Sequence, residues 1–225
     1  MGICGAMALQ AAKEASVPVI LHLDHSNSVD VCKAAIDFGF PSVMIDASAH
    51  PLEENIRRVK EVVDYAHSAG VFVEAEMGRI KGGGIEGGYY GKDFLAQVSD
   101  CVALVESTGV DSLAVGIGTA HGFYTEKPEL NFERLAEINE SVSIPLVLHG
   151  GTGVPREDVQ KGIKRGLNKI NVGTCIAATY MNGMRDELIR FGENAFTIDI
   201  VGPVKERVKA VVKDWIGVCM SAGKA

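Results

Sequence analysis

The alternation of short apolar runs with longer helical patterns constrains the fold of this chain more than any other feature. Each run has the length and composition of a strand, and each is followed by a segment with helical spacing of apolar residues. Strands are predicted in the run PVILHLDHSNS from Pro18 and at 42–46, 71–76, 111–118, 144–149 and 168–173. Helices are predicted at 2–15, 29–38, 52–69, 93–107, 132–139, from Pro155, at 175–190 and at 203–220. Apolar strands that alternate with helices in this way indicate an α/β fold with a buried parallel sheet.

Polar side chains help to decide between two parallel architectures, an open doubly wound sheet and a (β/α) barrel. A barrel builds its active site from the carboxyl ends of many strands, whereas an open sheet gathers such groups at one switch point. Here nearly every predicted strand ends in polar residues: Asp24 and His25, Asp46, Glu76, His121, His149 and Asn171. No GxGxxG segment opens the first helix, which leaves a dinucleotide-binding sheet with little support. The pattern therefore favours a barrel.

Length and composition predict a single domain over residues 1–225, since the chain is 47% apolar and shows no linker. The net charge of −7 argues against a nucleic-acid partner. No apolar run of about 18 residues and no leader pattern is present, so we expect a cytoplasmic protein without a membrane partner. Five scattered cysteines without CxxC spacing fit reduced thiols.

Three histidines at strand ends suggest a metal site. His25, His121 and His149 would give zinc three neutral nitrogen ligands and leave its fourth position open, as in catalytic zinc sites. Each is followed by Gly or Ser, which lets the chain turn beside the ligand. His22, inside a predicted strand, fits a packed or supporting role better, and two further histidines, His50 and His67, are predicted to face solvent.

Three carboxylates accompany these histidines. Asp24 directly precedes His25, and both can reach one site only where the strand ends and the chain bends. Asp24 is then a proton carrier beside the metal, or else a helix cap or a hydrogen-bond partner of a ligand. Asp46 and Glu76 either form a second cation site with one of the histidines or hold loops through hydrogen bonds.

Two glycine-containing turns suggest phosphate binding. Gly150-Gly151-Thr152-Gly153 follows the fifth predicted strand, and Asn171-Val172-Gly173-Thr174 follows the sixth. Late loops and a helix N-terminus often hold a phosphate in barrels, although the same residues also serve ordinary turns. The glycine-rich stretch GRIKGGGIEGGYYG after the third strand is predicted to be a mobile loop over the site.

Six segments together carry a family resemblance: LHLDHSNS, SVMIDASAHPLEENI, VEAEMGRIKGG, AVGIGTAHGFY, LVLHGGTGVP and KINVGT. In this order and spacing they resemble the class II zinc-dependent aldolases that act on fructose or tagatose 1,6-bisphosphate. The resemblance implies a TIM (β/α)8-type barrel, usually dimeric or tetrameric. It also implies reversible cleavage of a ketose bisphosphate into dihydroxyacetone phosphate and glyceraldehyde 3-phosphate.

Residue roles follow from the same resemblance. Asp24 corresponds to the catalytic proton carrier, and His25, His121 and His149 correspond to the ligands of the catalytic zinc. Asp46 and Glu76 correspond to ligands of a second divalent metal found in part of the family. The contacts to dihydroxyacetone phosphate correspond to Gly122, Gly150, Gly151, Thr152, Asn171, Val172, Gly173 and Thr174. Glu86 falls near an acid of the family's loop, but no role is transferred to it.

The sequence departs from the family pattern in strand number. We count six strands, which match the third to eighth strands of the family, so the first two βα units are expected to be absent and the barrel to be N-terminally truncated. Two rival interpretations stay open: a Schiff-base aldolase with Lys169 as nucleophile, and a non-catalytic aldolase-like subunit or fragment. Cys175 also stands where the family often has a polar residue.

Overall fold

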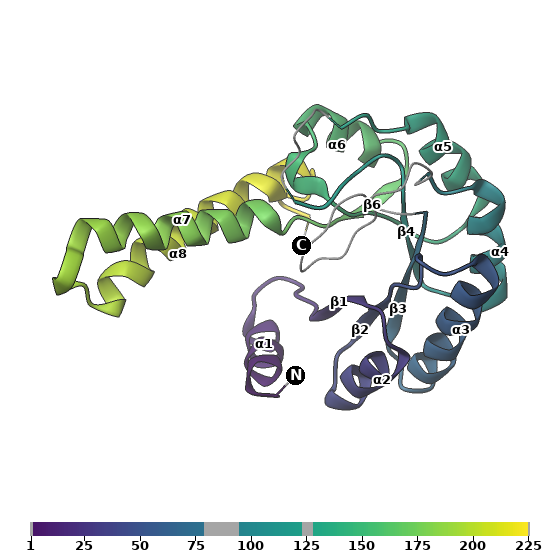
Figure 1. The fold of residues 1–225 in the computed structure, drawn as a ribbon, viewed down its shortest axis with the longest axis horizontal. Helices are drawn as coiled ribbons and strands as arrows, with labels where there is room; N and C mark the ends of the chain where they lie inside the picture. The colour runs from purple at the N-terminus through teal and green to yellow at the C-terminus, as the bar shows by residue number, and fades with distance from the viewer. Residues whose placement is uncertain (1, 79–94, 123–127, 225) are drawn as a thin grey trace.

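A computed structural model of the chain describes residues 2–78, 95–122 and 128–224. Its single described sheet has six parallel strands whose spatial order is their order in the sequence. The strands are β1 (His22–Ser26), β2 (Ser42–Ile45), β3 (Phe72–Met77), β4 (Ser112–Val115), β5 (Leu146–Leu148) and β6 (Leu167–Ile170). A doubly wound sheet would reverse its strand order at a switch point, and this sheet does not. The α/β expectation is confirmed, and the sheet is a curled half-barrel (Figure 1).

Most of the helices cover the convex face of the sheet, and the last two leave it. In chain order the α-helices are α1 (Gly2–Glu14), α2 (Val29–Phe38), α3 (Leu52–Ser68), α4 (Val98–Thr108), α5 (Phe132–Ser141), α6 (Arg156–Ile163), α7 (Thr174–Phe191) and α8 (Thr197–Val218). Helices α2 to α5 lie against the outer face, while α7 and α8 form a hairpin that projects from the body (Figure 1). No described helix is long and apolar enough to cross a membrane.

Side-chain alternation along the strands separates a core from a polar inner face. Val43 and Ile45 of β2 pack outward into the main apolar cluster with the helices, whereas Met44 belongs to a small separate cluster with Ala114 and Val147. In β3 the same alternation sends Val73, Ala75 and Met77 into the main cluster. It leaves Glu74 and Glu76 on the inner face, where both are buried. The inner face of the sheet therefore carries two buried carboxyl side chains, on the side where the residues of the family resemblance gather.

Local signals explain several boundaries. Ser28 caps α2, its hydroxyl accepting a hydrogen bond from the Val31 N–H at 3.4 Å, and Gly39 ends the helix in the left-handed region at φ 103°. Both were predicted. Asn131 caps α5 in the same way, accepting from the Arg134 N–H at 2.9 Å, and the sequence analysis did not identify it.

Several expected boundaries were wrong: the strands predicted at 111–118 and 168–173 already end at Val115 and Ile170. The first strand begins at His22, and Val19 and Ile20 before it are exposed. Among the described strands, β1 pairs with β2 alone. Helix α4 begins at Val98, and residues 93 and 94 lie outside the described part of the chain. Pro155 is the residue before α6 rather than its first residue. Helix α8 begins at Thr197, six residues before Pro203, because buried Ile200 anchors its first turn.

Candidate metal centre and active site

The three strand-end histidines converge on the inner side of the sheet. His25 lies at the end of β1, His121 follows β4 and His149 follows β5. The His25 and His149 ring centroids are 4.5 Å apart, those of His25 and His121 are 4.8 Å apart, and one nitrogen from each ring lies within 4.8 Å of the others. His149 is fully buried. A set of three imidazoles with no thiolate matches the protein ligands of a catalytic zinc ion.

An irregularity in β1 lets Asp24 and His25 face the same site. The pairing with β2 shifts register between Leu23 and Ser26, and His25 adopts a left-handed backbone conformation with φ 47°. Such a conformation is uncommon for a residue with a side chain, so surrounding contacts must hold it. Successive strand residues would otherwise point to opposite faces. The predicted bend is thus present, although it is a bulge within the strand rather than the strand's end.

A second group of possible ligands shares His25. Its Nδ1 lies 3.2 Å from Asp46 Oδ2 and 4.0 Å from Glu76 Oε2. Glu76 Oε2 is buried and, within the described residues, has no hydrogen-bond partner. Burial, with Asp46 nearby, raises the pKa of Glu76 well above its usual value. A divalent cation would satisfy that oxygen, so the residues present fit a second metal.

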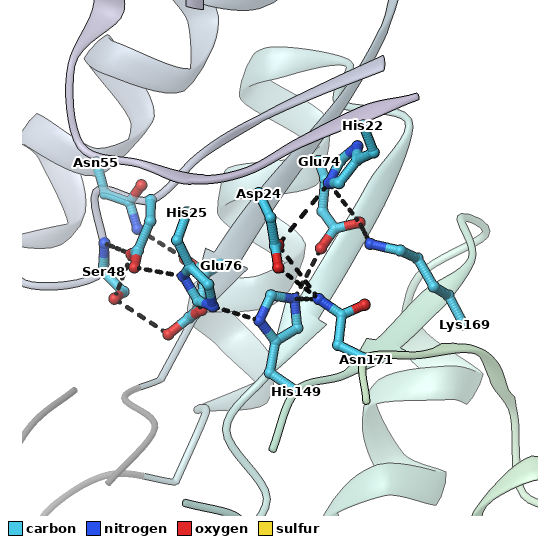
Figure 2. A network of polar contacts seen from close by, with 11 residues as sticks. His22, Asp24, His25, Ser48, Asn55, Glu74, Glu76, His149, Lys169 and Asn171 are labelled. Atoms are coloured by element: carbon cyan, nitrogen blue, oxygen red, sulfur yellow. Dashed lines mark hydrogen bonds and ion pairs between the residues drawn. The ribbon is translucent and has the colours of Figure 1, made fainter. Parts of the chain in front are cut away.

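Hydrogen bonds also hold Asp46 and Glu76 in place. The sequence offers such bonds as the alternative to a second cation site. The Ser48 hydroxyl donates to Asp46 Oδ1 at 2.7 Å and lies 3.2 Å from Glu76 Oε1 (Figure 2). Burial would raise the pKa of Asp46, but its hydrogen bonds with His25 and Ser48 lower it overall. Burial would likewise lower the pKa of His25, and the contact with Asp46 raises it overall. The two pKa values thus move in the directions that favour an ion pair between Asp46 and His25.

Glu74 is a buried member of the site that the sequence analysis missed. Its side chain is 2% exposed, with Oε1 2.8 Å from His149 Nε2 and Oε2 2.7 Å from Lys169 Nζ. Burial would raise the pKa of Glu74, but the hydrogen bond from His149 and the charge of Lys169 lower it to about 2. The period-2 alternation of VEAE would have placed Glu74 on the same face as Glu76.

Asp24 lies at the open side of this cluster. Its side chain is 51% exposed, and Asn171 Nδ2 donates to its two carboxylate oxygens at 3.2 and 3.3 Å (Figure 2). The same amide nitrogen lies 3.2 Å from His149 Nε2. Asn171 thus lies between the predicted proton carrier and a predicted metal ligand. His22, as expected, has a supporting position, with its Nδ1 2.8 Å from the Ser42 hydroxyl.

The two glycine-containing turns lie side by side. The Gly151 N–H donates to the Asn171 carbonyl at 3.0 Å, and the Cys175 N–H donates to the Thr152 hydroxyl at 3.3 Å. Gly173 directly precedes α7, an 18-residue helix. A helix of this length has a positive N-terminal end, which favours a bound anion. The arrangement can therefore hold a phosphate next to the histidines.

A cavity of about 400 Å³ connects these groups. The predicted site residues that line it are Asp24, His25, His121, His149, Gly150, Thr152, Asn171, Val172, Gly173 and Thr174. Asp46, Glu76, Gly122 and Gly151 do not line it, and buried Glu76 lies behind His25. The glycine-rich loop with Glu86 lies outside the described residues, so its predicted role stays a prediction.

Comparison with known proteins gives one consistent family. The family model "Fructose-bisphosphate aldolase class-II" matches residues 1–224. A fructose-bisphosphate aldolase from Geobacillus stearothermophilus is 44% identical over 211 residues, which cover 93% of this chain and 73% of that protein. One from Staphylococcus aureus strain Mu50 is 46% identical over 199 residues, 88% of this chain and 69% of that protein. The crystal structure of the YdjI aldolase from Escherichia coli K12 superposes with a TM-score of 0.85 at 37% identity, covering 99% of this chain and 77% of that one.

Proposed function

The chain belongs to the class II fructose-bisphosphate aldolase family, and we propose that it reversibly cleaves a ketose 1,6-bisphosphate. The products would be dihydroxyacetone phosphate and glyceraldehyde 3-phosphate, and the substrate fructose or tagatose bisphosphate. The observation that carries this proposal is the convergence of His25, His121 and His149 on a cavity that also contains Asp24. The two glycine-containing turns beside the cavity, which can hold a phosphate, support it.

We propose that the three histidines hold the catalytic zinc ion. When bound, zinc supplies a Lewis acid that stabilises the negative charge on the ketone oxygen as the C3–C4 bond breaks. Asp24 removes the proton of the C4 hydroxyl during cleavage and returns it during condensation. Its exposed carboxylate, anchored by Asn171, suits a group that must meet a substrate entering from solvent.

The remaining site residues are assigned to substrate orientation. Gly150 to Thr152 and Asn171 to Thr174 surround one phosphate, with the Thr152 and Thr174 hydroxyls as donors, and Gly122 contacts the same half of the substrate. The Gly151 and Asn171 N–H groups instead donate to backbone carbonyls and hold the two turns in place. Fixing a phosphate aligns the scissile bond and lowers the entropic cost of reaction. A second divalent metal at His25, Asp46 and Glu76 is proposed on the unpartnered buried oxygen of Glu76.

Larger-scale features of the family are also proposed for this chain. Its six strands, parallel and in sequence order, are taken as part of a TIM (β/α)8-type barrel within a single domain. Its oligomeric state is proposed to be a homodimer or homotetramer, which the exposed apolar side chains of α7 and α8 support. A cytoplasmic location stays a prediction from the sequence.

Chelation tests the proposed chemistry against the Schiff-base alternative. EDTA is expected to abolish cleavage of fructose and tagatose 1,6-bisphosphate by the protein, and added zinc to restore it. A Schiff-base enzyme would instead keep its turnover, and borohydride would trap the substrate on Lys169. In the structure the Lys169 ammonium is engaged with Glu74, which supports the metal-dependent mechanism.

A further inference from the structure

A chain of three side chains, with buried Glu74 at its centre, lies beside the histidine cluster. Glu74 connects His149 on one side with Lys169 on the other, and each contact uses a different carboxylate oxygen (Figure 2). Glu74 does not line the cavity, whereas His149 and Lys169 do. Glu74 therefore cannot be reached by substrate, and any role in the reaction has to pass through one of its partners.

Glu74 itself is not suited to bind a metal ion. It forms a third group of possible ligands with His22 and Asp24, whose ligand atoms lie within 4.8 Å of one another. However, the Lys169 ammonium is 2.7 Å from Glu74 Oε2 and already supplies the positive charge there. A metal ion at this group would be repelled by that ammonium.

The contact with Glu74 determines which nitrogen of His149 carries the proton. An ionised carboxylate can only accept hydrogen bonds, so His149 has to donate its Nε2–H to Glu74 Oε1 at 2.8 Å. The neutral ring then has its lone pair on Nδ1. That atom lies 2.7 Å from Nε2 of His25, on the side where the three histidines meet.

His25 shows the same arrangement with the two nitrogens exchanged. Its Nδ1 contacts Asp46, and its Nε2 faces His149. Two neighbouring ligands are thus each oriented by a carboxylate behind the ring. Partners of this kind fix the tautomer and the ring orientation of metal-binding histidines and increase their basicity.

We propose that Glu74, held in place by Lys169, is a positioning residue that fixes His149 in the Nε2–H tautomer with Nδ1 directed at the metal position. The inference rests on the proposed function for the identity of the metal. It assigns Lys169 a role as the partner of a carboxylate rather than as a nucleophile. Because Lys169 binds the second oxygen, the carboxylate cannot rotate away from His149.

The tautomer can be measured directly on the unaltered protein. Long-range ¹H–¹⁵N spectra of histidine-labelled protein, recorded without metal and with one equivalent of zinc, separate a protonated Nε2 from a protonated Nδ1. The expected result for His149 is a protonated Nε2 in both states. A protonated Nδ1 in the metal-free protein would overturn the inference.

Zinc affinity of a charge-removing variant gives the second readout. Glu74→Gln is expected to weaken zinc binding about 10- to 100-fold, measured by competition with a chelating dye. Lys169→Met should weaken it less, and the double variant should lose less than the sum of the single losses because the two residues act as one unit. A zinc affinity of Glu74→Gln within twofold of the parent protein would contradict the proposal.

A surface pair supplies the matched control. Glu61 accepts from Lys33 at 2.8 Å on the outer helices, so Glu61→Gln removes the same kind of ion pair far from the site. It should change neither the zinc affinity nor the His149 spectrum. Neither measurement requires sugar cleavage, so the inference and the proposed function can fail separately: normal cleavage with a protonated Nδ1 would refute only the role of Glu74.

Discussion

Asp24 is the residue on which the proposed proton transfer depends. Asp24→Ala should reduce kcat for fructose 1,6-bisphosphate cleavage at least about 100-fold, because general acid–base groups contribute rate factors of roughly that size or more. Zinc content should stay unchanged, because the proposed zinc ligands are the three converging histidines and not Asp24. Steady-state kinetics and metal analysis of the same preparation check both parts.

Asp30 provides the control for that substitution. It is an exposed carboxylate in the first turn of α2, close in sequence but outside the cavity. Asp30→Ala should leave kcat at the parent value. If Asp24→Ala also turns over normally, Asp24 is not the proton carrier.

The reactivity of individual cysteines tests which of them are buried in the core. Burial raises the pKa of Cys101 to about 12, so at pH 8 its thiol stays protonated and resists alkylation. Cys4 is exposed and should react first with iodoacetamide. Peptide mass spectrometry of native and urea-unfolded protein compares the two. Labelling of native Cys101 as fast as in urea would contradict its position in the core.

Some site residues could be predicted from the sequence because their type and position both carry information. His25, His121 and His149 lie near or after the carboxyl ends of strands, and a parallel sheet brings these ends together. Glu74 sits inside a strand and makes its contacts across the sheet, to residues 75 and 95 positions away. His149 follows β5 and Lys169 lies in β6, two and three strands away from β3, so only the curvature of the sheet brings those partners beside Glu74.

At the scale of elements, the turn after β5 is sensitive to substitution. Gly150 has φ 70°, and an added Cβ would lie 2.2 Å from the Ala120 carbonyl oxygen, next to His121. Gly150→Ala should therefore lower the free energy of unfolding by about 1–3 kcal/mol beyond the backbone strain and weaken zinc binding. Chemical denaturation and dye competition measure the two effects.

Gly70 is a matched control for this position. It has the same φ of 70° after α3, but an added Cβ would meet nothing within 4 Å. Gly70→Ala should cost only the strain of the left-handed conformation, about 1–2 kcal/mol, and leave zinc affinity unchanged. Equal losses for the two variants would show that the Gly150 contact is unimportant.

Element boundaries were predictable where one residue decides them and not where packing does. Ser28 begins α2 and Gly39 ends it, each through its own backbone geometry and hydrogen bonds. Both residues are visible in the sequence. Helix α8 begins at Thr197, six residues before Pro203, although proline is favoured in the first turn of a helix. Ile200 and Val204, both buried, hold this part of α8 in place, and that packing is invisible in the local sequence.

At the scale of the whole molecule, the projecting hairpin is the surface on which self-association is predicted. Ile189 is 75% exposed, and Phe196 and Ile198 are 72% and 80% exposed. Arg207 links the two helices through Asp186 and Glu187 at 3.0 and 2.7 Å. Ile189→Asp should reduce the mass measured by light scattering toward that of one chain. Val31→Asp, at an exposed apolar position on α2, should not. A single-chain mass for the parent protein would refute the prediction.

The central claim is that His25, His121 and His149 together bind the catalytic zinc ion. X-ray absorption spectroscopy of the protein loaded with one equivalent of zinc measures the ligand set directly. We expect three imidazole nitrogens at about 2.0–2.1 Å, with no sulfur scatterer. The imidazole signal should decrease in His149→Ala. Sulfur at about 2.3 Å, or zinc that is not retained by the parent protein, would contradict the claim.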